Sequence, residues 1–146
     1  MAKKPILPRN AGHIPQESFS TSGNMPAQPL SIRPFIGAKD FAVSRRFYRA
    51  FGFTEVVLSP VMSYFSLRSV GFYLQDAYVQ DWVDNTMLFL EVADVEQHWA
   101  ELAALDLPSK YEGVRIMPIR QEAWGKEGFV HDPSGILWHI GEFNKE

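Results

Sequence analysis

Two aspartates, Asp40 and Asp94, each mark the same arrangement of the chain: a short apolar strand, a brief link and then a helix. An aspartate at this place is typical of a helix N-cap, because its carboxylate accepts hydrogen bonds from amides of the first turn. Apolar residues recur at helical spacing after each aspartate, over 41–51 and 95–105. The chain is therefore predicted to contain two copies of one structural unit.

The first unit is predicted to hold a strand, a helix and three further strands. The first strand is expected over 32–36, where apolar residues alternate with Arg33 and Phe35, and where Pro34 favours an edge position. Gly52 ends the helix as the glycine that follows its C-cap. Three runs of strand-forming residues come next, at 53–58, 62–67 and 70–75.

The second unit repeats this order. Residues 87–92 form an apolar strand before the helix, and Pro108 stops the helix. The Asp-Pro-Ser-Gly sequence at 132–135 is a turn, because proline presets φ at its second position and glycine admits a positive φ. In the strand after the turn, alternation places His139 on the face opposite to Ile136. Strands are expected at 114–119, 126–130 and 136–140.

Composition excludes several classes of function. The 146 residues suffice for about one domain, and 46% of them are apolar, enough for a core. A net charge of −3 does not match a nucleic-acid-binding surface. The absence of cysteine excludes disulfides, thiolate chemistry and sulfur-ligated metals. No apolar run reaches the roughly 18 residues of a membrane span, and no signal peptide is evident, so we expect a cytoplasmic protein without membrane or nucleic-acid partners.

The first thirty residues differ from the rest of the chain. Residues 1–30 hold half of the prolines and show no hydrophobic periodicity. We interpret them as a proline-rich N-terminal arm, and residues 31–146 as a single domain with modules at 31–76 and 86–143. Because Pro34 weakens the first strand for self-pairing, a segment packed across a neighbour is a plausible cover. We therefore predict a two-fold homodimer with the arm in its interface.

The order and spacing of these elements resemble the vicinal oxygen chelate superfamily, which includes glyoxalase I, extradiol dioxygenases and bleomycin-resistance proteins. The resemblance extends over residues 31–143. It implies an α+β fold in which two βαβββ modules form curved mixed sheets around a concave pocket. Two segments, 84–86 and 124–129, are most similar to the bleomycin-resistance branch. The other matching segments are Lys39-Asp40, Ser44, Phe47-Tyr48, Gly52-Phe53 and the turn at 132–135.

Enzymes of this superfamily hold a divalent metal through one ligand from each of four strands, so the resemblance implies where ligands should lie. Most residues at those positions cannot bind a hard cation, and a single imidazole falls short of the three or more protein ligands that such metals require. We therefore predict no metal, no cofactor and no catalytic residue. The positions are Arg33 or Pro34, Met87 or Leu88, Tyr73 or Gln75, and His139.

Aromatic and polar residues at these strands and in the linker suit ligand binding, because flat rings stack on planar molecules. In the bleomycin-resistance branch a homodimer encloses two grooves, and the tryptophan of the Trp-Gly segment, here Trp124, contacts the planar part of the drug. Residues 58–62 lack the acidic groups and the phenylalanine with which that branch receives a cationic drug. The predicted ligand-binding residues are Trp124, Phe65, Tyr73, Gln75, Trp82, Phe89, His139 and Arg33.

The function predicted first is therefore metal-independent sequestration of a small, partly planar molecule, with antibiotics among the candidates. Two alternatives stay open. The chain is a glyoxalase- or dioxygenase-like enzyme if a metal site is rebuilt around Gln75, Glu91 and His139, or if His139 acts as a metal-free acid–base group. It is a structural or regulatory dimer if the pocket is vestigial. The loss of most metal-ligand positions counts against an enzyme.

Overall fold

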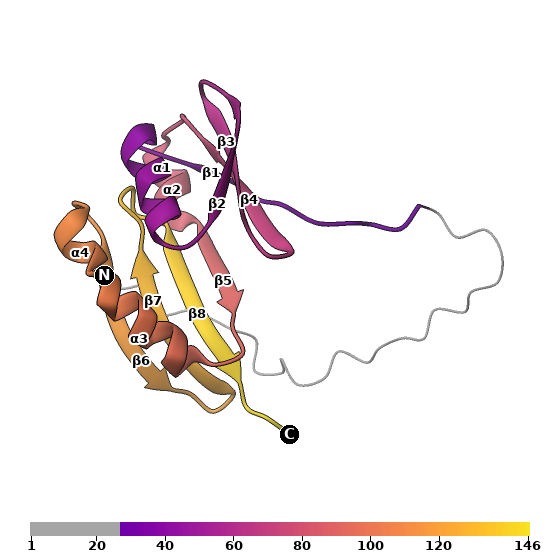
Figure 1. The fold of residues 1–146 in the computed structure, drawn as a ribbon, viewed down its shortest axis with the longest axis vertical. Helices are drawn as coiled ribbons and strands as arrows, with labels where there is room; N and C mark the ends of the chain where they lie inside the picture. Colours follow the sequence, from indigo (N-terminus) through magenta and orange to yellow (C-terminus); the bar gives the residue numbers. More distant parts are fainter. Residues whose placement is uncertain (1–26) are drawn as a thin grey trace. The chain divides into compact units, whose positions relative to one another are not determined.

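The computed structural model describes residues 27–146, and its elements follow the predicted repeat (Figure 1). Both halves show the order strand, helix and three strands, which confirms the predicted α+β fold with two βαβββ modules. The first half contains β1 (Phe35–Gly37), α1 (Phe41–Ala50), β2 (Thr54–Ser59), β3 (Met62–Leu67) and β4 (Val70–Gln75). The linker contains α2 (Gln80–Asn85). The second half contains β5 (Met87–Glu91), α3 (Val95–Leu105), α4 (Leu107–Lys110), β6 (Arg115–Gln121), β7 (Gly125–His131) and β8 (Leu137–Phe143).

Each half forms a four-stranded mixed sheet with the same topology. The strand order is β1-β4-β3-β2 in the first sheet and β5-β8-β7-β6 in the second. The first and last strands of each module pair in parallel, and the other neighbours are antiparallel. Asp40 accepts a hydrogen bond from the Val43 amide at 3.1 Å, and Asp94 accepts one from the Gln97 amide at 3.0 Å. The two N-caps predicted from the sequence are thus confirmed.

The first strand is shorter than predicted. Residues 32–34 lie outside β1, and Ile32 is 96% exposed. Pro34 explains the difference, because it has no N–H to donate to a neighbouring strand. Its carbonyl oxygen still accepts a hydrogen bond from the Tyr73 amide at 2.9 Å, and regular pairing begins with Phe35 opposite Tyr73.

Two short helices, α2 and α4, were not predicted. The linker helix α2 has no side-chain N-cap bond, so the sequence carries little local signal for it. Before α4, Asp106 adopts a left-handed conformation with φ of 48° and turns the chain. Pro108 then lies in the first turn of α4, where a missing N–H costs nothing. Pro108 therefore lies within a second helix, which begins at Leu107, two residues after the end of α3.

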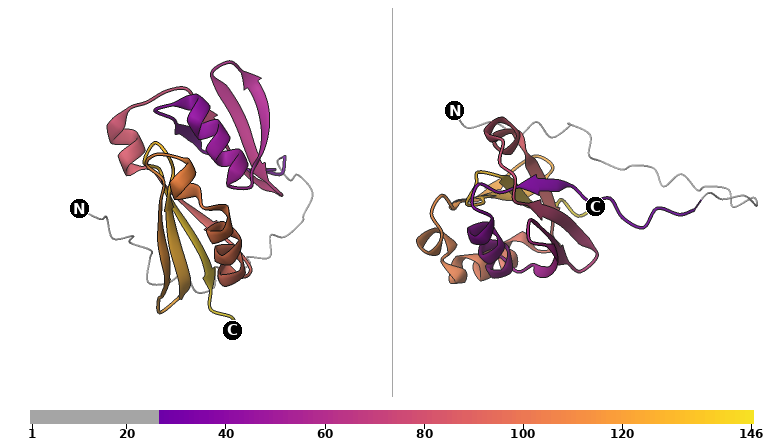
Figure 2. Two further views of the ribbon diagram at one scale, coloured as in Figure 1. Left: turned by 60° about the vertical axis from the view of Figure 1, so that its left-hand side comes forward. Right: turned by 90° about the horizontal axis from the view of Figure 1, so that it is seen from above.

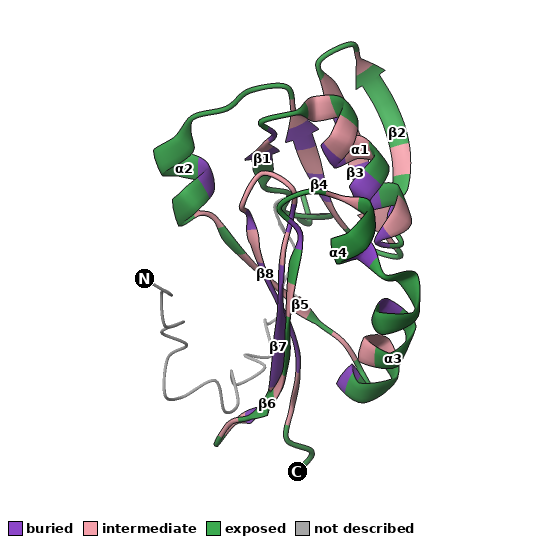
Figure 3. Cartoon of the chain, turned by 90° about the vertical axis from the view of Figure 1, so that its left-hand side faces the viewer, coloured by how far each residue is buried: buried purple, intermediate pink, exposed green. Residues whose placement is uncertain are grey.

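One face of each sheet is covered by a helix. Helix α1 packs on β2 and β4, and α3 packs on β6, β7 and β8 (Figure 2). We call the opposite face of each sheet its open face. Burial follows this layering: β7 is buried along most of its length, whereas the outer sides of α1 and α3 are exposed (Figure 3). Among residues 27–146, no helix has the length and apolar character needed to cross a bilayer.

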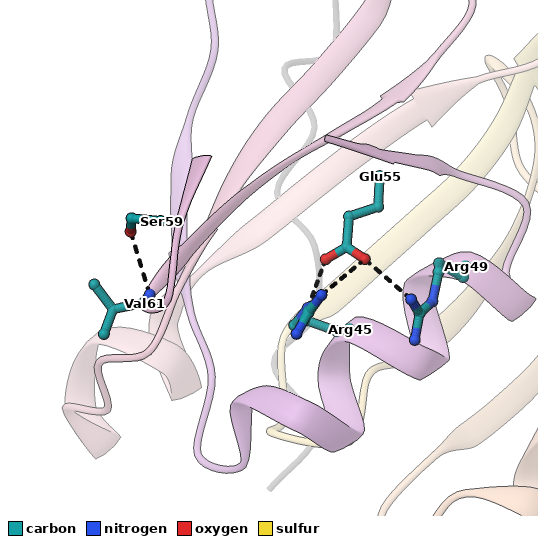
Figure 4. Close-up of polar contacts among 5 residues, drawn as sticks. All are labelled: Arg45, Arg49, Glu55, Ser59 and Val61. Atoms are coloured by element: carbon teal, nitrogen blue, oxygen red, sulfur yellow. Dashed lines mark hydrogen bonds and ion pairs between the residues drawn. The ribbon is translucent and has the colours of Figure 1, made fainter. Parts of the chain in front are cut away.

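Helix α1 is tied to β2 by an ion-pair cluster on the covered face (Figure 4). The Glu55 carboxylate accepts hydrogen bonds from Arg45 at 2.6 and 3.2 Å and from Arg49 at 3.1 Å. Burial tends to raise the pKa of Glu55, but these bonds and charges outweigh burial and lower the pKa below its ordinary value. In the adjoining turn, the Val61 amide donates to the Ser59 hydroxyl at 3.2 Å.

An aromatic core joins the two modules. The ring of Tyr48 on α1 lies 4.8 Å from that of Phe72 and 5.6 Å from that of Phe65, both in the first sheet. The same ring lies 5.9 Å from that of Trp138 in the second sheet. All four side chains are at most 4% exposed. The first module is therefore anchored on the second through Tyr48.

The predicted turn at 132–135 forms the polar part of this contact between the two modules. One carboxylate oxygen of Asp132 accepts hydrogen bonds from three successive amides, those of residues 134–136, at 2.8–2.9 Å. The other accepts from the Tyr48 hydroxyl at 2.6 Å, and that hydroxyl accepts from the Trp138 indole at 3.0 Å. Burial raises the pKa of Asp132 although these bonds oppose the shift. Gly135 has a φ of 107°, as the turn requires.

Candidate ligand-binding site

Three half-buried aromatic rings meet on the open face of the second sheet. Phe89 lies on β5, Trp124 precedes β7, and Phe143 ends β8. Their ring centroids are 5.9 Å apart for Phe89 and Trp124, 5.7 Å for Phe89 and Phe143, and 5.2 Å for Trp124 and Phe143. We call these three residues the aromatic cluster. It offers a flat apolar surface on which a planar molecule can stack.

The backbone beside the aromatic cluster makes room for it. Gly141 on β8 pairs with Glu91 on β5 and shares a face with His139 and Phe143. A Cβ atom at position 141 would lie 3.0 Å from the tip of the Phe89 ring, closer than side chains normally approach. The missing side chain therefore lets Phe89 lie across β8.

Phe143 was missed by sequence reasoning. The predicted strand ended at residue 140, whereas β8 continues to Phe143 because its last residues pair with the start of β7, with Gly125 opposite Phe143. The alternation that places His139 on this face could have identified Phe143 as well, since residues 139, 141 and 143 point the same way.

His139 lies beside this cluster but is nearly enclosed. It is 4% exposed, and its Nδ1 atom lies 3.3 Å from a carboxylate oxygen of Glu127, which is 2% exposed. Its ring lies 4.9 Å from that of Phe129 and 6.3 Å from that of Phe89. A buried carboxylate needs such a partner. Within the single chain, His139 is therefore a buried partner of Glu127, and Phe89 is the member of the aromatic cluster whose ring lies near it.

The open face of the first sheet carries a second group of rings together with an arginine. Nη1 of Arg33 donates a hydrogen bond to the Tyr73 hydroxyl at 3.0 Å, which raises the pKa of the guanidinium. The guanidinium carbon also lies 4.2 Å from the centroid of the Tyr64 ring. Phe35 stacks on Tyr73 with centroids 4.7 Å apart. Tyr64 was not predicted, although its alternation with Phe65 places the two on opposite faces of β3.

The predicted residues thus fall into separate groups. Arg33, Tyr73 and Gln75 belong to the first sheet and its approach, and Phe89, Trp124 and His139 belong to the second. Trp82 lies apart on α2 and is 73% exposed.

Phe65 does not belong to the site. It is 0% exposed and packs against Tyr48 and Phe72 on the face of the first sheet that α1 covers. Alternation along 62–67 was sufficient to separate two faces, but it could not tell which face the helix covers. The prediction of Phe65 as a ligand-binding residue is therefore corrected to a core residue.

The residues at the positions where the sequence resemblance implies metal ligands do not fit a divalent cation. Arg33, a cation itself, is held there by Tyr73. The only imidazole of the set, His139, is paired with Glu127. Across residues 27–146, no three histidine, aspartate or glutamate side chains gather closely enough to hold a metal ion. Fewer than three such ligands is too few for these metals.

A cleft of about 420 Å³ adjoins the aromatic cluster at the start of α3. Phe143 belongs to both, but the lining residues Lys126 and Glu142 lie on the face of the sheet that α3 covers, opposite to the rings. Lys126 donates to Glu96 at 3.2 Å across its wall. Its lining is mixed apolar and charged: Ala93, Asp94, Glu96, Gly125, Lys126, Glu142, Phe143, Asn144 and Lys145.

Stability is expected to fall as the pH is lowered below about 6.5, because of His131 on β7. Burial and then the charge of Arg115 lower the pKa of His131, so the folded chain binds this proton more weakly than the unfolded chain. Melting temperatures from pH 7.5 to 5.5 should therefore drop, and the drop should be smaller in His131→Gln. Burial also lowers the pKa of His98, so His98→Gln is the matched comparison. An unchanged pH profile in both variants would contradict this.

Two βαβββ modules with identical strand order form a fold that this chain shares with solved glyoxalase and bleomycin-resistance proteins. The chain is similar to a bleomycin resistance determinant encoded on the transposon Tn5, with 15% identity, 79% of this chain and 98% of that chain covered, and a TM-score of 0.67. The fold expected from the sequence resemblance is confirmed.

Two further structures show the same fold. A bleomycin-binding protein from Streptomyces verticillus, complexed with copper(II)-bleomycin, is 20% identical, covers 82% of this chain and 100% of its own, and has a TM-score of 0.68. A lactoylglutathione lyase from Agrobacterium tumefaciens is 17% identical over 79% and 95%, with a TM-score of 0.59. The sequence itself matches no protein-family model and no curated protein.

Proposed function

We propose that residues 31–146 bind a small, partly planar molecule without a metal, in the manner of bleomycin-resistance proteins. The observation that carries this proposal is the aromatic cluster of Phe89, Trp124 and Phe143 on an open sheet face. The similarity to structures described as bleomycin-binding supports it, and antibiotics are therefore among the candidate ligands. The misfit of the residues to a divalent cation favours binding without a metal.

A thermal-shift screen of planar molecules, including bleomycin, tests this proposal. A ligand present at about 100 times its dissociation constant should stabilise the folded chain by roughly 2.7 kcal/mol. The shift should be the same with and without EDTA, because no step of binding uses a metal. One tightly held divalent ion per subunit, together with loss of the shift in EDTA, would contradict the proposal.

A metal-free enzyme is the second candidate, and the His139–Glu127 pair favours it. A carboxylate that orients an imidazole is a common arrangement in acid–base catalysis. The nearly complete burial of both side chains argues against direct contact with a substrate in the single chain. The rebuilt metal site has less support, since within residues 27–146 no three histidine, aspartate or glutamate side chains gather closely enough to hold a metal ion.

We also propose a two-fold homodimer. In the first sheet β2 is an edge strand, and its Val56, Val57 and Leu58 are 51%, 58% and 49% exposed. Neighbouring exposed apolar residues on an edge strand mark a surface that another chain covers. We propose that residues 1–30 contribute to this interface, of which residues 1–26 lie outside the described part of the chain. The cytoplasmic location stays a prediction.

Removing the arm is expected to weaken the dimer. A chain that begins at Pro29 should dissociate at higher concentration than the full chain in sedimentation velocity, because part of the proposed interface is lost. Val57→Lys in the full chain is the comparison, since it places a charge on the exposed edge strand without touching the arm. A shortened chain with unchanged dimerisation and unchanged melting would show that the arm has no such role.

A further inference from the structure

Arg33 is a positioned cation for which residues 27–146 supply no partner of opposite charge. Its guanidinium is held from two sides, by the hydrogen bond to the Tyr73 hydroxyl and by the face of the Tyr64 ring. The residue is nevertheless exposed. Within the described range 27–146, no carboxylate lies at ion-pairing distance from Arg33, whereas Arg45 and Arg49 of α1 are both paired with Glu55.

The first sheet also holds the Tyr64 ring, on which Arg33 lies, in place. Tyr64 on β3 pairs with Tyr73 on β4, and their ring centroids are 5.4 Å apart. A Cβ atom at Gly71 would collide with the Tyr64 ring, so the ring lies over β4 where that strand has no side chain. Both rings and Arg33 therefore share one surface, the open face of the first sheet.

We propose that Arg33, Tyr64 and Tyr73 form a receptor for the anionic group of a planar aromatic ligand, either a carboxylate or a phosphate-type group. A guanidinium has five N–H donors, and Arg33 uses one of them on Tyr73. The planar fork of the remaining donors matches two oxygens of such an anion. Phe35, 58% exposed and stacked on Tyr73, offers the adjoining surface for the ligand's ring.

The second sheet repeats the same combination. The guanidinium of Arg120 on β6 lies 5.3 Å from the centroid of the Phe129 ring on the open face. In the part of the chain that the structure describes, Arg120 too has no carboxylate at ion-pairing distance. Because Glu127 is the residue opposite Arg120 in the pairing of β6 with β7, only Arg33 is offered here as a group that attracts an anionic ligand and repels a cationic one. The receptor lies on the first sheet and the aromatic cluster on the second, so the inference rests on the proposed function in one respect, that the chain binds a planar molecule.

Matched probes test the inference. Titrations with 2-naphthoate and with the neutral 2-naphthamide, followed by calorimetry, should show about tenfold tighter binding of the anion, and higher salt should reduce that preference. Arg33→Gln should bring the affinities for the two compounds together, and Arg33→Lys should retain only part of the preference for the anion. The control is Arg46→Gln, which removes an exposed arginine of α1 and should behave like the wild type. Melting curves establish that each variant is folded.

The outcomes separate this inference from the function on which it rests. If naphthamide binds and naphthoate binds no better, the anion receptor is overturned and the planar-ligand site stands. If the preference survives in Arg33→Gln, the anion is bound elsewhere and the assignment to Arg33 is wrong. If neither compound binds at millimolar concentration, both the receptor and the planar-ligand proposal fail.

Discussion

Replacing Asp132 with alanine is expected to lower the free energy of unfolding by about 3–4 kcal/mol, because four hydrogen-bond donors lose their acceptor in a buried place. Three of these donors are the amides of residues 134–136, and the fourth is the Tyr48 hydroxyl. The loss should act on the whole domain, since Tyr48 belongs to the first module and the turn to the second. Urea denaturation of the variant measures the effect.

Asp94→Ala is the matched control for this change. Asp94 is also an aspartate that accepts from a backbone amide, but it is exposed at the start of α3. Loss of such a cap costs about 1 kcal/mol. If Asp132→Ala lowered the free energy of unfolding no more than Asp94→Ala, the contact between the modules would not depend on the Asp132 carboxylate.

Phe65→Ala is expected to lower the free energy of unfolding by about 3–5 kcal/mol, the cost of a cavity in an aromatic core. Phe65 is 0% exposed and its ring is 5.6 Å from those of both Tyr48 and Phe72. Trp124→Ala should cost only about 1 kcal/mol, because Trp124 is half-buried on an open face and loses mainly its ring contacts. Urea melts of both variants give the comparison. Equal losses would mean that Trp124 packs as a core residue.

The repeat, the caps and the turn could be predicted because local chemistry determines them. Asp40 and Asp94 precede helices whose amides need an acceptor, and Gly135 supplies the positive φ of the turn. The ends of β1 and β8 could not be predicted from the local spacing of residues, because they depend on strand pairing. Pro34 shortens β1, and the partner strand β7 extends β8 to Phe143.

The candidate site was predicted only in part, because it depends on which sheet face a helix covers. Alternation separates Tyr64 from Phe65 but does not say that α1 packs on the side of Phe65. The pairing of His139 with Glu127 could have been predicted from the sequence. A hairpin centred on the turn at 132–135 brings the face of residue 127 next to that of residue 139. The contact of Arg33 with Tyr64 involves a residue outside any strand, and no sequence period predicts it.

Trp124 and its neighbours are proposed to bind a planar molecule without a metal. Titration of 2-naphthamide into the wild type and into Trp124→Ala, both in EDTA, tests it most directly. The wild type should bind in EDTA, and the variant should bind at least about fivefold more weakly while remaining folded, which corresponds to roughly 1 kcal/mol for a lost aromatic contact. Equal binding by the two proteins, or binding only when a divalent metal is supplied, would contradict it.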